Sequence, residues 1–243
     1  MTNGIIMKKI LILATVALMS INTAYASLIY STSNISNNLR DISSTGTQFN
    51  LSDDAMTGEI GMGFNFGFYD IFVNTVNVSS NGFLALGGFA SDDGCCSGKP
   101  LPADDGYNGI IAGLWEDLNT NNNSTGTMFY QTLGAVGSRE FVVGFYDVAH
   151  FPSSDPVTFE MILHEGSNNI EFQYGLVSYE NGTHSVGIEN TTGTSGIQYL
   201  YGDDIERLSN TGVLFSTTPV SEPSMLAMFA FGLFAMRRLR KNA

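Results

Sequence analysis

Short apolar and β-branched runs recur along most of this chain, separated by clusters of glycine, asparagine, aspartate and serine. Runs of this length between turn-forming residues are typical of β-strands, and no long stretch of helical periodicity competes with them. The predicted strands are residues 60–66, 73–79, 83–87, 110–115, 127–133, 140–148, 157–164, 170–174, 184–189, 197–201 and 213–216. Such a series predicts an all-β fold, an antiparallel two-layer β-sandwich or jelly roll.

Two turn sequences support antiparallel pairing. Asn81-Gly82 separates two apolar runs, and both residue types tolerate the positive φ that a tight hairpin needs. Residues 166–169, with the sequence Gly-Ser-Asn-Asn, predict a second hairpin. The Ser- and Asn-rich residues 28–54 are expected to form a loop with one or two edge strands. In Trp115-Glu116-Asp117 we expect the ring to enter the core and the acids to face water.

The N-terminus has the pattern of a secretory signal peptide. Lys8 and Lys9 precede an apolar stretch, and Ala24 and Ala26 place small residues where a signal peptidase requires them. We therefore predict export, with residues 1–26 removed by cleavage before Ser27.

The C-terminal residues 220–243 combine three kinds of sequence. A polar joint, Ser221-Glu222-Pro223, precedes the apolar residues 225–236, and a basic cluster follows, formed by Arg237, Arg238, Arg240 and Lys241. As a helix the apolar run would measure about 18 Å, against the roughly 30 Å of hydrocarbon that a stable span crosses. The cations favour a segment that stops in the inner membrane with its positive end in the cytoplasm. An ordinary C-terminal anchor and a docking helix are the alternatives.

The order of Glu222-Pro223, an apolar transmembrane helix rich in glycine and alanine, and a terminal arginine cluster resembles the PEP-CTERM sorting tail of Gram-negative bacteria. The resemblance implies recognition by an exosortase-type processing enzyme and transient anchoring in the inner membrane. It also implies delivery to the cell surface, the outer membrane or an extracellular exopolysaccharide matrix such as a biofilm. Ser221 departs from the pattern, because the family usually has a proline there.

The part of the chain between the two terminal segments is strongly acidic. The whole chain has a net charge of -13, yet six of its ten Lys and Arg residues lie in the terminal segments. This balance excludes nucleic acid as a partner, because phosphate binding needs the opposite sign. Divalent cations and basic surfaces remain compatible with it, as does solubility through self-repulsion.

Several aromatic and glycine-rich motifs occur along the body. They are residues 64–69 (FNFGFY), 78–83 (VSSNGF), 110–119 (ending in WEDLN), 128–130 (MFY) and 159–175 (ending in FQYG). This series resembles a nidogen-like β module of bacterial surface and extracellular-matrix proteins, over about residues 60–190. The resemblance implies display rather than catalysis, because these motifs are mostly structural.

The two cysteines are adjacent, at Cys95 and Cys96. Thiols of an exported chain meet an oxidising compartment, which favours a disulfide. Adjacent Cα atoms lie about 3.8 Å apart, closer than the roughly 4.4 Å or more that a disulfide usually spans, so a bond between them would be strained. We expect this vicinal disulfide; intermolecular bridges and a soft metal site are the alternatives.

Paired aspartates recur in the predicted loops. Asp92-Asp93 and Asp104-Asp105 could together supply the carboxylate oxygens that calcium requires, and Asp53-Asp54 and Asp203-Asp204 form similar pairs. The spacing matches no EF-hand. A calcium site at the first two pairs is therefore weighed against ordinary solvated turns.

The residues that could support hydrolysis are few. The three histidines are His150, His164 and His184; Ser185 adjoins the last and Asp147 lies near the first. No Gly-x-Ser-x-Gly sequence exposes a nucleophile, and no clear glycosidase-type carboxylate pair is evident. We expect His164 and His184 to be partly exposed residues at strand ends, and the protein not to be an enzyme.

These observations predict one extracellular β-sandwich domain, residues 27–219, in a non-catalytic surface or matrix protein with a structural or adhesive role. A carbohydrate-binding module is the alternative, since tyrosines on a concave face can stack on sugars. The candidates are Tyr69, Tyr107, Tyr130, Tyr146, Tyr174, Tyr179, Tyr199 and Tyr201. A hydrolase acting on polysaccharides is the third hypothesis.

Overall fold

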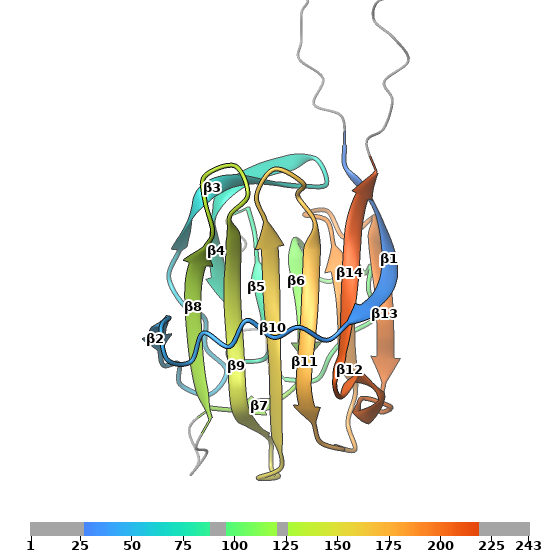
Figure 1. Ribbon diagram of the computed structural model, residues 1–243. Helices are drawn as coiled ribbons and strands as arrows, with labels where there is room; N and C mark the ends of the chain where they lie inside the picture. The colour runs from blue at the N-terminus through green and yellow to red at the C-terminus, as the bar shows by residue number, and fades with distance from the viewer. Residues whose placement is uncertain (1–26, 88–95, 121–125, 219–243) are drawn as a thin grey trace, which may run out of the picture.

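The computed structural model describes residues 27–87, 96–120 and 126–218. Within them two antiparallel β-sheets pack face to face, and no α-helix is present (Figure 1). In this described part of the chain, no helix has the length and apolar character needed to cross a membrane. The predicted all-β sandwich is confirmed.

The larger sheet has the strand order β1-β14-β11-β10-β9-β8-β2, and the short strand β7 also pairs with β9. Its strands are β1 (Ile29–Ser36), β2 (Thr47–Phe49), β7 (Leu118–Asn119), β8 (Thr127–Leu133), β9 (Glu140–His150), β10 (Pro156–His164), β11 (Ile170–Val177) and β14 (Thr211–Thr218). Because Ile29 pairs with Thr218, the described body begins and ends side by side at one edge of this sheet (Figure 1).

The smaller sheet has the order β13-β12-β6-β5-β4-β3. Its strands are β3 (Ile60–Phe68), β4 (Ile71–Val78), β5 (Phe83–Ala85), β6 (Ile110–Trp115), β12 (His184–Glu189) and β13 (Gly196–Gly202). A single-turn 3₁₀ helix, η1 (Glu206–Leu208), precedes β14. Every predicted strand is present, and the edge strands expected within residues 28–54 are β1 and β2; β7 was not predicted.

Apolar side chains gather in three layers rather than one. The main core lies between the sheets and contains most of the buried aromatic rings, including Phe66, Phe145 and Phe215. A second cluster lies on the outer face of the smaller sheet, beneath the loop that follows Cys96, and includes Trp115. A third lies on the outer face of the larger sheet. Because both faces of the central strands are covered, β6 and β12 are buried at every position instead of alternating.

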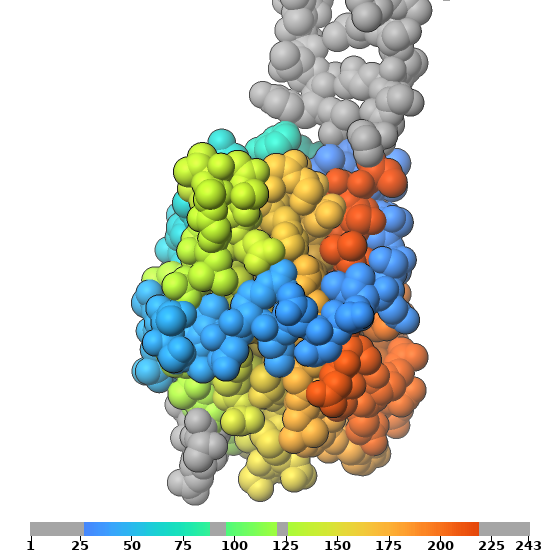
Figure 2. Space-filling view, viewed as in Figure 1, coloured from blue at the N-terminus to red at the C-terminus, as the bar shows by residue number. Residues whose placement is uncertain are grey.

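The third cluster is covered by residues 37–46, which connect β1 to β2 by crossing the outer face of the larger sheet (Figures 1 and 2). Ile42 is the buried apolar residue of this crossing segment, and it packs with Phe129, Val142 and Ile162. Glu160 on β10 accepts the backbone N–H groups of Arg40 and Asp41. The crossing segment therefore belongs to the folded body rather than to a loose loop.

The two predicted hairpins differ in detail. The connection between β10 and β11 is the expected turn, with positive φ at Gly166 and Asn168. The connection between β4 and β5 is longer than a two-residue hairpin, because Ser79 donates its N–H to the carbonyl of Phe83 and only Gly82 has positive φ. Asn81 is buried there, and its side-chain carbonyl accepts the N–H of Leu118. The Asn81 side chain therefore binds the first residue of β7 rather than forming part of a tight turn.

Candidate functional site

Three ionisable side chains meet at one end of the sandwich, between the two sheets. Glu116 follows β6 of the smaller sheet, where the chain crosses to β7 of the larger one. His150 is the last residue of β9 in the larger sheet, and His184 is the first of β12 in the smaller. All three are buried, and their ligand atoms lie within 4.8 Å of one another.

Each imidazole in this cluster contacts a backbone carbonyl through one nitrogen and a carboxylate through the other. His150 Nε2 lies 3.1 Å from the carbonyl oxygen of Ser178, and its Nδ1 lies 2.7 Å from Glu116 Oε2. His184 Nδ1 lies 2.9 Å from the carbonyl oxygen of Gly202, and its Nε2 lies 2.9 Å from Glu116 Oε2. Both rings therefore point their second nitrogen at the same carboxylate oxygen.

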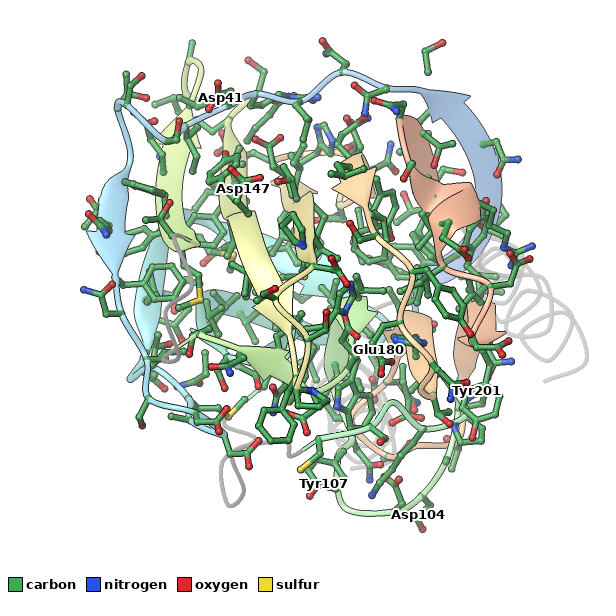
Figure 3. The ribbon with its side chains drawn as sticks, turned by 90° about the horizontal axis from the view of Figure 1, so that it is seen from below. Asp41, Asp104, Tyr107, Asp147, Glu180 and Tyr201 are labelled. Carbon is green, nitrogen blue, oxygen red and sulfur yellow. The ribbon has the colours of Figure 1, made fainter. Side chains whose placement is uncertain are left out.

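Glu180, in the connection between β11 and β12, is the outermost member of the cluster. Its Oε2 lies 3.1 Å from His184 Nε2, and its side chain is 18% exposed. Figure 3 views the molecule from this end and shows Glu180 among the connections that close it. The cluster thus contains two imidazoles and two carboxylates, with solvent on the Glu180 side only.

The surrounding charge is negative. Burial would lower the pKa of His184, but the Glu116 carboxylate, the carbonyl of Gly202 and the Glu180 carboxylate together outweigh burial and raise it. Burial, followed by the nearby acids Asp54 and Asp53, raises the pKa of Asp117 to about 6. The shift of His184 shows that the carboxylates around it favour positive charge on the ring.

The structure corrects two expectations from the sequence. Glu116 does not face water and His184 is not partly exposed; both are buried. Trp115 packs outward between Phe83 and Tyr107, at ring-centroid distances of 5.2 and 5.5 Å, so the next residue of the chain turns toward the interior. His164, by contrast, is partly exposed as predicted, with its side chain 21% exposed.

The residues considered for hydrolysis do not form a triad. The hydroxyl of Ser185 donates to the backbone carbonyl of Lys99, away from His184. Asp147 accepts a hydrogen bond from Thr158 on the surface. No Ser-His-carboxylate arrangement therefore occurs among these residues.

A second group of acids lies near the first. Carboxylate oxygens of Asp53, Asp54 and Asp117 lie within 4.8 Å of one another, at more exposed positions. Asp54 accepts a hydrogen bond from the buried Asn81, and Cys96 Sγ lies 3.8 Å from its carboxylate. Cys95 lies outside the described residues, so the pairing of the two cysteines stays a prediction.

Only half of the predicted calcium ligands can be placed. Asp92 and Asp93 lie outside the described residues. Asp105 forms an ion pair of 3.1 Å with Lys99 and accepts the N–H of Tyr107, whereas Asp104 contacts the Asn108 amide at 3.4 Å. These contacts are those of an ordinary polar turn, and the calcium site stays a prediction.

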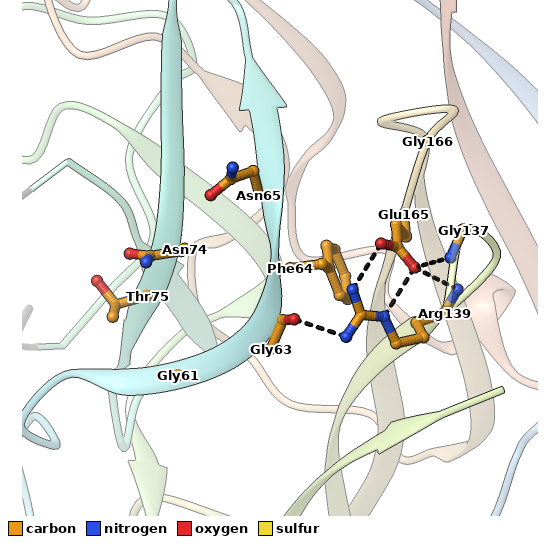
Figure 4. A pocket seen from close by; sticks show the side chains of 10 residues that line it. All are labelled: Gly61, Gly63, Phe64, Asn65, Asn74, Thr75, Gly137, Arg139, Glu165 and Gly166. Carbon is orange, nitrogen blue, oxygen red and sulfur yellow. Dashed lines mark hydrogen bonds and ion pairs between the residues drawn. The ribbon is translucent and has the colours of Figure 1, made fainter. Parts of the chain in front are cut away.

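A shallow groove lies beside β3, lined by Gly61, Phe64, Asn65, Asn74, Thr75 and Glu165 among others (Figure 4). The two charged residues of the groove, Arg139 and Glu165, form an ion pair with each other. Arg139 forms two hydrogen bonds to Glu165, of 2.8 and 2.6 Å, and donates a third to the carbonyl of Gly63. The groove therefore offers amides and hydroxyls rather than a reactive group.

Most of the tyrosines named for sugar binding are part of the packing. Tyr174 is fully buried and Tyr69 nearly so, whereas Tyr179 and Tyr201 are exposed by 52% and 46%. These two adjoin Glu180 and Gly202, which both contact His184, so one exposed ring lies in the connection between β11 and β12 and the other near the end of β13.

The predicted processing sites lie at or beyond the limits of the described residues. Ser27 is the first described residue and is exposed. Ala24, Ala26 and the tail residues Ser221, Glu222, Pro223, Arg237, Arg238 and Arg240 lie outside this part of the chain, as does the apolar run expected to form a transmembrane helix.

Comparison with known proteins identifies a family but no individual relative. Neither the curated proteins nor the solved structures include a match to this chain. A family model described as NIDO related matches residues 29–224, which contain every strand of the sandwich. This match agrees with the nidogen-like motifs of the sequence and covers most of the chain, so the protein belongs to the nidogen-related family.

Proposed function

We propose that this protein is a non-catalytic component of the bacterial cell surface or exopolysaccharide matrix, exported by its N-terminal signal and sorted by its PEP-CTERM-like tail. The nidogen-related domain over residues 29–224 is the observation that carries the proposal, since such a domain is compatible with an exported structural protein. The delivery route rests on the sequence of the two terminal segments.

Two features of the structure support a structural role. Ile29 pairs with Thr218, so the segments that carry the sorting signals continue from neighbouring points at one sheet edge. The described histidines are engaged by carboxylates and, for His150 and His184, backbone carbonyls, rather than paired with a nucleophile. A domain attached at one edge leaves its opposite end and both faces available for contacts in the matrix.

Fractionation of cells tests the delivery route. The intact chain and a version ending at Val220 are expressed in a Gram-negative host with an exosortase, and the mature ends are mapped by mass spectrometry. We expect the intact chain at the surface, starting at Ser27 and lacking Arg237 to Ala243, and the shortened chain released. A surface form that retains Arg240 would support permanent anchoring, and a cytosolic form that retains residues 1–26 would refute export.

Carbohydrate binding is the second candidate, favoured by the exposed Tyr179, between β11 and β12, and the exposed Tyr201, near the end of β13. Exposed aromatic rings are the groups on which sugar rings stack. A glycan array probed with the wild type, Tyr179→Ala and Tyr201→Ala tests it, with the exposed Phe72→Ala on β4 as the control. Retention that depends on either tyrosine but not on Phe72 supports a binding module, and no retention supports display alone.

A further inference from the structure

The cluster of His150, His184, Glu116 and Glu180 lies where the chain twice passes between the sheets. Glu116 stands between β6 and β7, and Glu180 lies between β11 and β12. The two histidines come from different sheets. A ligand bound by all four side chains would therefore join the two layers of the sandwich at this end.

The hydrogen-bond geometry assigns the protons of both imidazoles. His184 Nδ1 is 2.9 Å from the carbonyl oxygen of Gly202 and His150 Nε2 is 3.1 Å from that of Ser178, so each of these nitrogens must carry a hydrogen. In a neutral ring the other nitrogen then presents a lone pair. Backbone carbonyls that hold one N–H of a histidine in this way are the usual outer partners of a metal-bound imidazole.

Two of the remaining atoms make no hydrogen bond, whereas His150 Nδ1 contacts Glu116 Oε2 at 2.7 Å. His184 Nε2 lies 2.9 Å from Glu116 Oε2 and 3.1 Å from Glu180 Oε2, yet this buried nitrogen makes no hydrogen bond. Glu116 Oε1 is also buried without a hydrogen bond. Unpartnered buried groups are costly, because they lose their water without a replacement. A cation among these atoms would satisfy both.

No arginine or lysine in the described residues supplies that cation. Arg40, Lys99, Arg139 and Arg207, the four that the described ranges contain, form ion pairs with other acids. Asp117 directly follows Glu116, and its carboxylate lies within 4.8 Å of those of Asp53 and Asp54, so negative charge is in excess at this end of the molecule. The compensating charge must come from protons on the imidazoles or from a bound ion.

We propose that this cluster is a structural Zn²⁺ site, with His150 Nδ1, His184 Nε2 and Glu116 as buried ligands and Glu180 as the ligand on the solvent side. Two imidazole nitrogens with carboxylate oxygens suit zinc, whereas calcium and magnesium prefer oxygen ligands alone. The ligand atoms of Glu116, His150 and His184 lie within 4.8 Å of one another, close to the largest separation of about 4.4 Å that two bonds of about 2.2 Å to one ion allow, so small side-chain movements would place an ion among them. The site is separate from the calcium site considered at Asp92, Asp93, Asp104 and Asp105.

Metal analysis of the purified full chain tests the proposal. Bound metal ions are removed from the chain with a chelator, and the chain is then dialysed against a zinc solution. The number of zinc ions per chain is measured by elemental mass spectrometry. We expect one zinc ion per chain and a higher melting temperature with zinc than with calcium or magnesium. His150→Gln and His184→Gln are each expected to lose that ion.

His164→Gln is the matched control, because His164 also lies beside two carboxylates, Glu140 and Glu171, but with Arg40 already in place as the cation. This variant should bind zinc as the wild type does. Failure of the wild type to retain zinc, or equal retention by His150→Gln and His184→Gln, would overturn the proposal and leave a cluster of protonated imidazoles. Loss of zinc in His164→Gln alone would also overturn it.

If the histidine variants do not fold, a measurement on the wild type still tests the proposal. Cobalt replaces zinc, and its visible absorption distinguishes four-coordinate nitrogen and oxygen ligands from six oxygen ligands. Anomalous scattering from a zinc-grown crystal then locates the ion. Four-coordinate absorption with the ion between His150 and His184 supports the proposal, and an ion at any other position refutes it.

Discussion

Tyr174 on β11 donates a hydrogen bond of 2.6 Å to the carbonyl oxygen of Gly113 on β6, in the opposite sheet. Hydrogen bonds between the layers of a sandwich core are not part of either sheet's ladder. Gly113 lies where the register between β6 and β12 shifts, between Ser185 and Gly187. The buried tyrosine thus satisfies a carbonyl beside an irregularity in the neighbouring sheet.

Removing that hydroxyl should destabilise the fold. In Tyr174→Phe the Gly113 carbonyl loses this buried donor, so we expect the free energy of unfolding to fall by about 1–3 kcal/mol. Urea denaturation measures it. Tyr199→Phe is the control, because its hydroxyl donates to Asn34 at the surface and water can replace it. An equal decrease in the free energy of unfolding of the two variants would show that the hydrogen bond between the sheets stabilises the fold no more than a surface hydrogen bond does.

The turn between β4 and β5 should tolerate no side chain at its glycine. A Cβ at Gly82 would stand 2.0 Å from the carbonyl oxygen of Leu114, and the residue also has a φ of +80°. We expect Gly82→Ala to cost more than about 4 kcal/mol or to prevent folding. Gly106→Ala is the control, because Gly106 has a φ of +91° but nothing within 4 Å of the added atom. It should cost only about 1–2 kcal/mol, and a similar loss in both would refute the steric argument.

The crossing segment is held to the larger sheet by Arg40. Its guanidinium lies 2.7 Å from Glu171 Oε1 and 3.0 Å from Glu140 Oε2, and its side chain is 13% exposed. Arg40→Ala leaves these carboxylates without their partner, so we expect a loss of about 3 kcal/mol. The control Arg207→Ala removes an exposed pair with Asp204 at 3.7 Å and should change stability by less than about 1 kcal/mol.

Arg40→Ala should also change how the free energy of unfolding depends on pH below pH 4.5. Burial alone would raise the pKa of Glu171, but hydrogen bonds from His164 and Arg40 lower it to about 2. The stabilisation from Glu171 is therefore present above its unfolded pKa of 4.5 and lost as the pH falls toward 2. Arg40→Ala should lose less stability than the wild type over this interval. Parallel curves would contradict the assignment.

The contribution of Glu189 to the free energy of unfolding should have the opposite pH dependence and fall as the pH rises. Burial first, and then the nearby Asp105 and Asp104, raise its pKa from 4.5 to about 7, although the N–H of Ala103 acts to lower it. The folded state then binds a proton more tightly than the unfolded chain does. Its contribution is complete below pH 4.5 and is lost as the pH rises through 7.

Replacing this acid should remove that loss. We expect Glu189→Gln to be more stable than the wild type at pH 8 by up to about 3 kcal/mol and nearly equal to it at pH 4. Urea unfolding at both pH values gives the comparison, with the exposed Glu206→Gln as the control. An equal difference at the two pH values would indicate a packing effect rather than titration.

The sequence by itself determined the strands of the sandwich. Strands such as β6, β8 and β12 were predicted with their observed bounds, because apolar runs and turn residues are local signals. The same signals indicated the edge strands within residues 28–54 and the hairpin at Gly166 and Asn168.

Only the tertiary structure decided which residues meet. Alternation along a strand says that Trp115 and Glu116 face opposite ways, but not which side is outside; the cover of Tyr107 over Trp115 settled this and buried Glu116. His150 and His184 reach Glu116 because strand register in two separate sheets brings their ends together. Pairing between distant segments depends on the energy of the whole packed core, and no short stretch of sequence encodes it.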